Sequence, residues 1–141
     1  MTILEEVALR QSLRVGLLVI GLLAALLYAA IYCYRGPSKA KTLVKAVPLL
    51  SFAGAGVATF AHPLVIGALV LSAIGDIALS RDGNRAFLIG LIGFATAHLL
   101  YILHFWGLSD GLALSWFALI VLLFALSTEV WFAPFTGDLR W

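Results

Sequence analysis

The sequence predicts an all-α fold, a polytopic membrane bundle of five transmembrane helices that forms a single domain over residues 1–141. Hydrophobic residues make up 63% of the chain, whereas soluble domains are close to half apolar. Charged residues make up 11% and gather mainly between long apolar segments. Most of these segments reach the length that a helix needs to cross a bilayer, about 17 to 25 residues.

The first apolar segment, residues 15–34, contains no charged side chain and is the clearest span. The residues before it include Glu5 and Glu6, so we expect an amphipathic lead-in and not a cleaved signal. The second span is predicted at residues 46–61, with Pro48 in its first turn, where a helix tolerates proline. The later spans are predicted at residues 64–80, 86–106 and 112–132. Short connections make consecutive helices antiparallel neighbours.

The distribution of Lys and Arg predicts the orientation, because cytoplasmic loops are enriched in these residues. Two of the nine, Arg10 and Arg14, precede the first span. The other seven fall in the first connection, the third connection and the tail: Arg35, Lys39, Lys41, Lys45, Arg81, Arg85 and Arg140. We therefore expect the N-terminus outside and the C-terminus in the cytoplasm, in the inner membrane of a bacterial cell.

Several classes of site are not indicated. The net charge of +2 is too small to suggest a nucleic-acid partner. A single cysteine, Cys33, allows neither an internal disulfide nor a cysteine-based zinc site, and three scattered histidines do not form a metal site. No motif of a soluble enzyme is present, and no cofactor is expected.

Asp76 is the unusual residue, because a carboxylate in the middle of a membrane costs about 2.5 to 3.5 kcal/mol on insertion scales. Ser72, Asp76 and Ser80 are four residues apart and share one helix face. On the next span His98 and Tyr101 share a face. Residue spacing leaves two interpretations of Asp76 open. It is either a functional group or a structural residue paired with a serine, a backbone group or Arg81.

An ordered set of residues in the third and fourth spans resembles the YhhN family of polytopic membrane proteins, which includes the lysoplasmalogenases. The set reads G-D…F-x-x-G-L-x-x-F-x-x-A-H-x-x-Y and consists of Gly75, Asp76, Phe87, Gly90, Leu91, Phe94, Ala97, His98 and Tyr101. Upstream, Lys45 and Pro48 open the second span. The resemblance implies that the chain corresponds to the N-terminal five of about eight spans. A second intramembrane aspartate would then belong to the later spans, and a 141-residue chain is expected to be weak or inactive.

The resemblance implies hydrolysis of the vinyl ether bond of a lysoplasmalogen to a fatty aldehyde and a glycerophospho-alcohol, with lysophospholipid as substrate and membrane lipid around it. Vinyl ether hydrolysis begins with protonation at carbon, so a buried Asp76 is expected to be the general acid. His98 would activate water, and Tyr101 would orient His98 or the substrate. The expected substrate-binding residues are Lys45, Ser72, Arg81 and Arg85, with Lys39 and Lys41 in the same basic cluster.

Two further considerations bear on this hypothesis. In an antiparallel hairpin that turns near Gly83, Asp76 lies level with Gly90, and His98 lies about 12 Å deeper along the bundle. A direct contact between Asp76 and His98 is therefore not expected. Two alternatives remain, a small transporter or proton-relay protein and a non-catalytic truncated membrane protein, because intramembrane Asp and His are also used in proton relays.

Overall fold

A computed structural model of the chain describes residues 2–36 and 38–108, together with positions 116, 119–121, 123, 124 and 127. The chain divides into two compact units, Met1–His104 and Phe105–Trp141. All the contacts discussed below lie in the first unit. The predicted span at residues 112–132 lies outside the described residues except for those isolated positions. The single domain over residues 1–141 stays a prediction.

The all-α prediction is confirmed for the described part of the chain, which contains four α-helices and one π-helical turn. Helix α1 spans Ile3–Leu27 and continues into the π-helical turn η1, Tyr28–Tyr32. It begins earlier than the predicted span because Thr2 and Glu5 form a capping box. The Thr2 hydroxyl accepts from the Glu5 amide, and the Glu5 carboxylate accepts from the Thr2 amide. The expected lead-in is therefore helical and continuous with the span.

Helix α2 spans Lys39–Ala58 and begins seven residues before the predicted start of the second span at Ala46. The Ser38 hydroxyl caps it by accepting from the Lys41 amide at 3.1 Å. The assignment of Lys39, Lys41 and Lys45 to the first connection is therefore wrong, because all three lie in the first two turns of α2. A serine followed by residues that favour helices was sufficient to start the helix early.

Pro48 lies in the interior of α2, and its predicted place in the first turn is also wrong. Proline has no amide hydrogen, so it cannot donate to the carbonyl of Val44 one turn earlier. In a membrane helix such a free carbonyl needs another partner, supplied by a side chain, a water or a neighbouring helix. Pro48 therefore leaves the carbonyl oxygen of Val44 without its usual backbone donor, in a part of the helix whose side chains are mostly apolar.

Helices α3, Pro63–Leu79, and α4, Asn84–Trp106, agree with the predicted spans to within two residues. His62 caps α3, and its ring nitrogen accepts from the Leu64 amide at 3.3 Å. Within the described residues, three helical segments are long and apolar enough to cross a membrane, namely α1 with η1, α2 and α4. Helix α3 is apolar but has 17 residues, the lower end of the usual length for a span. These helices indicate a membrane protein.

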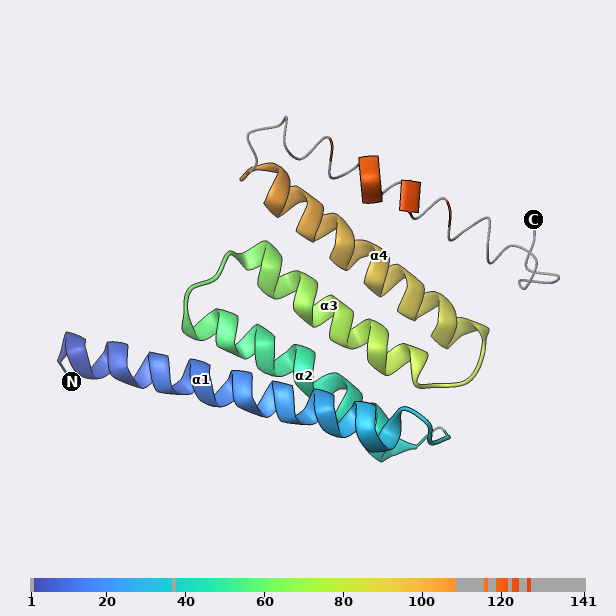
Figure 1. The fold of residues 1–141 in the computed structure, drawn as a ribbon, viewed down its shortest axis with the longest axis horizontal. Coiled ribbons are helices and arrows are strands. Elements are labelled where there is room, and N and C mark those ends of the chain that lie inside the picture. Colours follow the sequence, from blue (N-terminus) through green and yellow to red (C-terminus); the bar gives the residue numbers. More distant parts are fainter. Residues whose placement is uncertain are drawn as a thin grey trace. The chain divides into compact units, whose positions relative to one another are not determined.

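Consecutive helices pack against one another: α1 contacts α2, and α2 contacts α3 (Figure 1). Helices α3 and α4 approach closely at Gly75, Gly90 and Gly93. A Cβ atom placed on Gly75 would lie 3.2 Å from the Gly90 carbonyl oxygen, and one on Gly90 would lie 3.2 Å from the Gly75 carbonyl oxygen. Ala97, further along the same contact, is fully buried. This register agrees with the expectation that Asp76 lies level with Gly90.

The close approach predicts a large effect of a single methyl group. A Cβ atom on Gly90 would lie 2.6 Å from the Leu79 Cγ atom as well as close to the Gly75 carbonyl. We expect Gly90→Ala to destabilise the protein by about 1–3 kcal/mol, the usual cost of overpacking. Gly16→Ala is the control, because no atom lies within 4 Å of the added Cβ, and alanine favours a helix over glycine. Thermal unfolding in detergent measures both variants. Equal melting temperatures for Gly90→Ala and the wild type would contradict the close contact.

Candidate functional site

An ion pair joins α2 and α3 at the residue that the sequence singles out. The Lys45 Nζ atom lies 2.9 Å from the Asp76 Oδ1 atom, and the two side chains are 24% and 17% exposed. Asp76 therefore faces a neighbouring helix. Its partner is Lys45 on α2 and not a serine or Arg81, the partners considered from the sequence. Lys45 was expected to hold substrate phosphate, but here it contacts the candidate acid.

The Lys45 ammonium supplies a counter-charge that offsets part of the cost of placing the Asp76 carboxylate in a membrane helix. Ionisable side chains in such helices usually pair with each other and face the interior of the bundle. Removal of one partner of a buried pair leaves the other charge uncompensated, which is strongly unfavourable. The same arrangement also places a proton donor and a proton acceptor within hydrogen-bond distance in a medium of low dielectric constant.

An open hollow of about 240 Å³ adjoins the pair. Its lining comes from three helices: Ala25 and Tyr28 of the α1–η1 segment, Lys45, Pro48 and Leu49 of α2, and Asp76 of α3. Apart from the ion pair and the Tyr28 hydroxyl, its side chains are apolar. The hollow thus combines an acid–base pair with walls suited to a hydrocarbon chain.

The π-helical turn of α1 begins at Tyr28, which lines this hollow. The turn is closed by the Cys33 amide, which donates to the Tyr28 carbonyl at 2.8 Å. Single π-helical turns are often found at functional sites, since the extra residue changes the direction of the side chains around it. Sequence reasoning did not identify Tyr28, because hydropathy carries no signal for a π-helical turn.

A second polar contact joins α2 and α3 about one turn from the ion pair, nearer the end of the bundle where α2 begins and α3 ends, which is called their shared end below. The hydroxyl oxygens of Thr42 and Ser80 lie 2.6 Å apart, and either can be the donor. Thr42 is buried, and its hydroxyl also lies 3.2 Å from the Ser38 carbonyl oxygen. Ser72, one turn from Asp76 in the opposite direction, is buried as well. The serines of α3 therefore lie on the same side of the helix as Asp76, as their spacing predicted.

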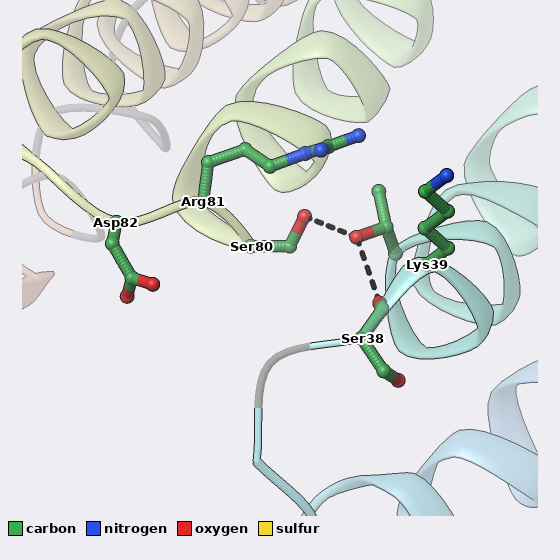
Figure 2. A pocket seen from close by; sticks show the side chains of 6 residues that line it. Ser38, Lys39, Ser80, Arg81 and Asp82 are labelled. Carbon is green, nitrogen blue, oxygen red and sulfur yellow. Dashed lines mark hydrogen bonds between the residues drawn. The ribbon is translucent and has the colours of Figure 1, made fainter.

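A polar cavity of about 250 Å³ lies beyond this contact, at the start of α2 and the end of α3 (Figure 2). Its lining residues are all polar: Ser38, Lys39, Thr42, Ser80, Arg81 and Asp82. Of these, sequence reasoning had selected Arg81 as a substrate-binding residue and Lys39 as a member of the basic cluster. Ser38 and Thr42 were not identified, although a serine just before a helix and a threonine on its inner face are readable signals.

The remaining candidate residues lie away from the ion pair. His98 is exposed, and its Nδ1 atom lies 2.7 Å from the Phe94 carbonyl oxygen of its own helix. Tyr101 is half-buried on α4, and Arg85 is exposed in the first turn of that helix. No hydrogen bond or ion pair joins Asp76 to His98 in the part of the chain that the structure describes. Over residues 2–36 and 38–108, no three His, Cys, Asp or Glu side chains form a group that could hold a metal ion.

Comparison with known proteins gives a match to a protein family. The model of the YhhN family matches residues 40–141. This range includes α3, α4, all of α2 except its first residue, and both polar contacts between α2 and α3. No curated protein matches the chain. No solved structure matches it.

Proposed function

Because the chain belongs to the YhhN family, we propose that it is an integral membrane hydrolase that cleaves the vinyl ether bond of lysoplasmalogens. The products are a fatty aldehyde and a glycerophospho-alcohol. The observation that supports this proposal most strongly is the ion pair of Lys45 and Asp76 beside a hollow with apolar walls. It supplies acid–base groups at a place where a lipid chain can lie.

The chemistry sets three requirements. A proton adds to the vinyl carbon remote from oxygen, and the π electrons form the new C–H bond. This leaves an oxocarbenium cation, to which water adds with loss of a proton. In the resulting hemiacetal, the bond between the former vinyl carbon and the glycerol oxygen breaks. The hemiacetal hydroxyl gives up its proton to become the aldehyde carbonyl, and the glycerol oxygen takes up a proton to become a free hydroxyl. The site therefore has to supply a proton, stabilise a cation and accept a proton from water.

Lys45 and Asp76 can meet these requirements together. Transfer of one proton from Nζ to Oδ1, atoms 2.9 Å apart, converts the ion pair to a neutral amine and a carboxylic acid. The Asp76 acid then protonates carbon, and its carboxylate is left to stabilise the cation. The Lys45 amine accepts the proton of the attacking water, which restores the ion pair.

This assignment changes the expected roles. Asp76 keeps the role of general acid, but its proton belongs to the pair and not to the carboxyl alone. Lys45 takes the role of base that was expected for His98. His98, which is exposed and bonded to its own helix, is then not required for the proton transfers.

A proton relay, the alternative function, would need polar groups in sequence across the whole thickness of the membrane. Within the described helices, the closest polar contacts between α2 and α3 gather towards one end, at Thr42–Ser80 and Lys45–Asp76. Asp76 is three residues from the end of α3, about 5 Å along the helix axis. A vinyl ether at the boundary between headgroups and acyl chains would lie at this depth. This clustering favours the hydrolase.

Aldehyde release from a lysoplasmalogen in detergent micelles is the experiment that tests the proposed function. The saturated ether analogue is the control, since it lacks the bond that accepts the proton. The sequence predicts at most weak activity for this chain, but the ion pair and the adjoining hollow are both formed by its described helices. We therefore expect slow but measurable release of aldehyde, and from the vinyl ether lipid alone. Absence of aldehyde with a folded protein, or equal release from both lipids, would rule out this function.

We also propose the orientation that the charges predict, with the N-terminus outside and the C-terminus in the cytoplasm of a bacterial cell. Reporter domains fused into the connection between α2 and α3, and after Trp141, test it. The connection between α2 and α3 contains no Lys or Arg, so we expect its reporter to be outside and the C-terminal reporter to be inside. A cytoplasmic reporter between α2 and α3 would overturn the orientation.

A further inference from the structure

The cations at the shared end of α2 and α3 lie in different environments. Lys45 is paired with Asp76. The Lys41 Nζ atom donates to two backbone carbonyls of the preceding connection, that of Arg35 at 2.6 Å and that of Cys33 at 3.3 Å. These two lysines therefore already have partners within the chain.

Lys39 and Arg81 differ, because both line the polar cavity and neither has an ion-pair partner in the described residues. They come from different helix ends, the first residue of α2 and the second residue after α3. Figure 2 shows the Arg81 side chain extended towards α2, while the Asp82 carboxylate points away from the Arg81 guanidinium. Two cations that share a cavity repel each other, so an anion between them would lower the electrostatic energy.

We propose that this cavity is a phosphate-ester site in which Lys39 and Arg81 contact the phosphate oxygens. An arginine guanidinium and a lysine ammonium both form charge-assisted hydrogen bonds to phosphate, and arginine can bind two oxygens at once. The Ser38 and Ser80 hydroxyls line the same cavity and add hydrogen-bonding capacity. If the proposed function holds, on which this assignment of the ester rests, the phosphate is that of the lysolipid substrate.

The spacing along the two helices fits such a substrate. Lys39 precedes Lys45 by six residues, about 9 Å along α2. Asp76 lies three residues, about 5 Å, before the end of α3, and Arg81 is the second residue beyond that end. In a lysoplasmalogen, seven bonds separate the phosphorus from the carbon that takes the proton. At the length of about 3.5 Å for three extended bonds, this distance is about 8 Å. One lipid molecule therefore spans from the cavity to the ion pair.

The Thr42–Ser80 contact lies between the two places and belongs to the wall of the cavity. On α2, Thr42 precedes Lys45 by three residues, and on α3, Ser80 follows Asp76 by four, so all four side chains lie along one line of contact between the helices. The cavity and the ion pair are thus successive positions on the same line of contact. The glycerol of the lipid would lie beside Thr42 and Ser80.

The test measures binding to the full chain in detergent, with ligands that cannot be cleaved. The probes are a saturated-ether lysophospholipid, the matching alkyl glycerol without phosphate, and inorganic phosphate. We expect the phosphate group to increase lipid affinity about tenfold or more. Lys39→Gln and Arg81→Gln should each remove most of this difference without changing the affinity for alkyl glycerol. Arg35→Gln is the matched control, since it removes a nearby exposed cation that does not line the cavity.

The outcomes separate this site from the proposed function. A phosphate-dependent affinity that is lost in both cavity variants supports the site whether or not aldehyde is released from lysoplasmalogen. Equal affinity of the wild type for the two lipids, or an equal loss in Arg35→Gln, overturns it. If inorganic phosphate displaces the lysolipid at matched concentration, the cavity binds phosphate that is free in solution and is not a site for the headgroup of a lipid. Gel filtration of each variant confirms that it is folded.

Discussion

Asp76→Asn is expected to lower vinyl ether cleavage by about 10²- to 10⁴-fold, the usual contribution of a positioned general acid. The amide has nearly the same shape as the carboxyl group, but it cannot give a proton to carbon or accept one from Lys45. It also leaves the Lys45 ammonium, 2.9 Å away in the wild type, without its anionic partner. The measurement is the initial rate of aldehyde release at saturating lysoplasmalogen.

Glu6→Gln is the control for this loss. Glu6 is an exposed carboxylate on α1 that pairs with Arg10 one turn away, so its removal should leave the rate unchanged. His98→Ala should lose much less than Asp76→Asn, because His98 is exposed, is bonded to its own helix and takes no part in the proposed proton transfers. Full activity in folded Asp76→Asn would contradict the general-acid role.

Lys45 gives the second large effect, and two substitutions separate its roles. Lys45→Met should lower kcat by about 10²-fold or more, because no amine remains to exchange protons with Asp76 and with water. Lys45→Arg should keep the ion pair and the stability of the fold that Lys45→Met loses. Its kcat should nevertheless stay low, since a guanidinium does not give up its proton in proteins. Rates and KM values of both variants, with their melting temperatures, provide the test.

The same two variants distinguish this role from the one expected from the sequence, in which Lys45 holds the substrate phosphate. If Lys45 bound the phosphate, Lys45→Met would raise KM, whereas Lys45→Arg would keep most of the substrate binding. High kcat in Lys45→Arg would therefore show that Lys45 is an electrostatic partner only and not a base.

Hydropathy was sufficient to predict the four α-helices in the described part of the chain, because a segment without charges has few alternatives in a chain this apolar. The ends of the helices depended on local contacts that hydropathy does not report. Ser38 and the Thr2–Glu5 capping box both start helices earlier than the apolar segments do. The early start of α2 is the important one, since it moves Lys45 from a connection into a helix.

The Lys45–Asp76 pair could not be predicted from spacing within one helix. It depends on the register of α2 against α3, which is fixed by the turn at residues 59–62 and by side-chain packing along the contact. The Gly75–Gly90 register was predictable, because a short connection at Gly83 leaves little freedom to the α3–α4 hairpin. The residues on which the resemblance to the family rests therefore fall into two groups, those at the contact of α3 with α4 and one that faces α2. Gly75, Gly90 and Ala97 let α3 and α4 approach, whereas Asp76 faces α2.

A double-mutant cycle on aldehyde release tests most directly whether Lys45 and Asp76 act as one unit. The cycle compares Lys45→Met, Asp76→Asn and the double variant with the wild type. Residues that share one proton-transfer function are strongly non-additive, so the double variant should lose about as much as the worse single variant. Losses that multiply in the double variant would show two independent contributions and would contradict the paired mechanism.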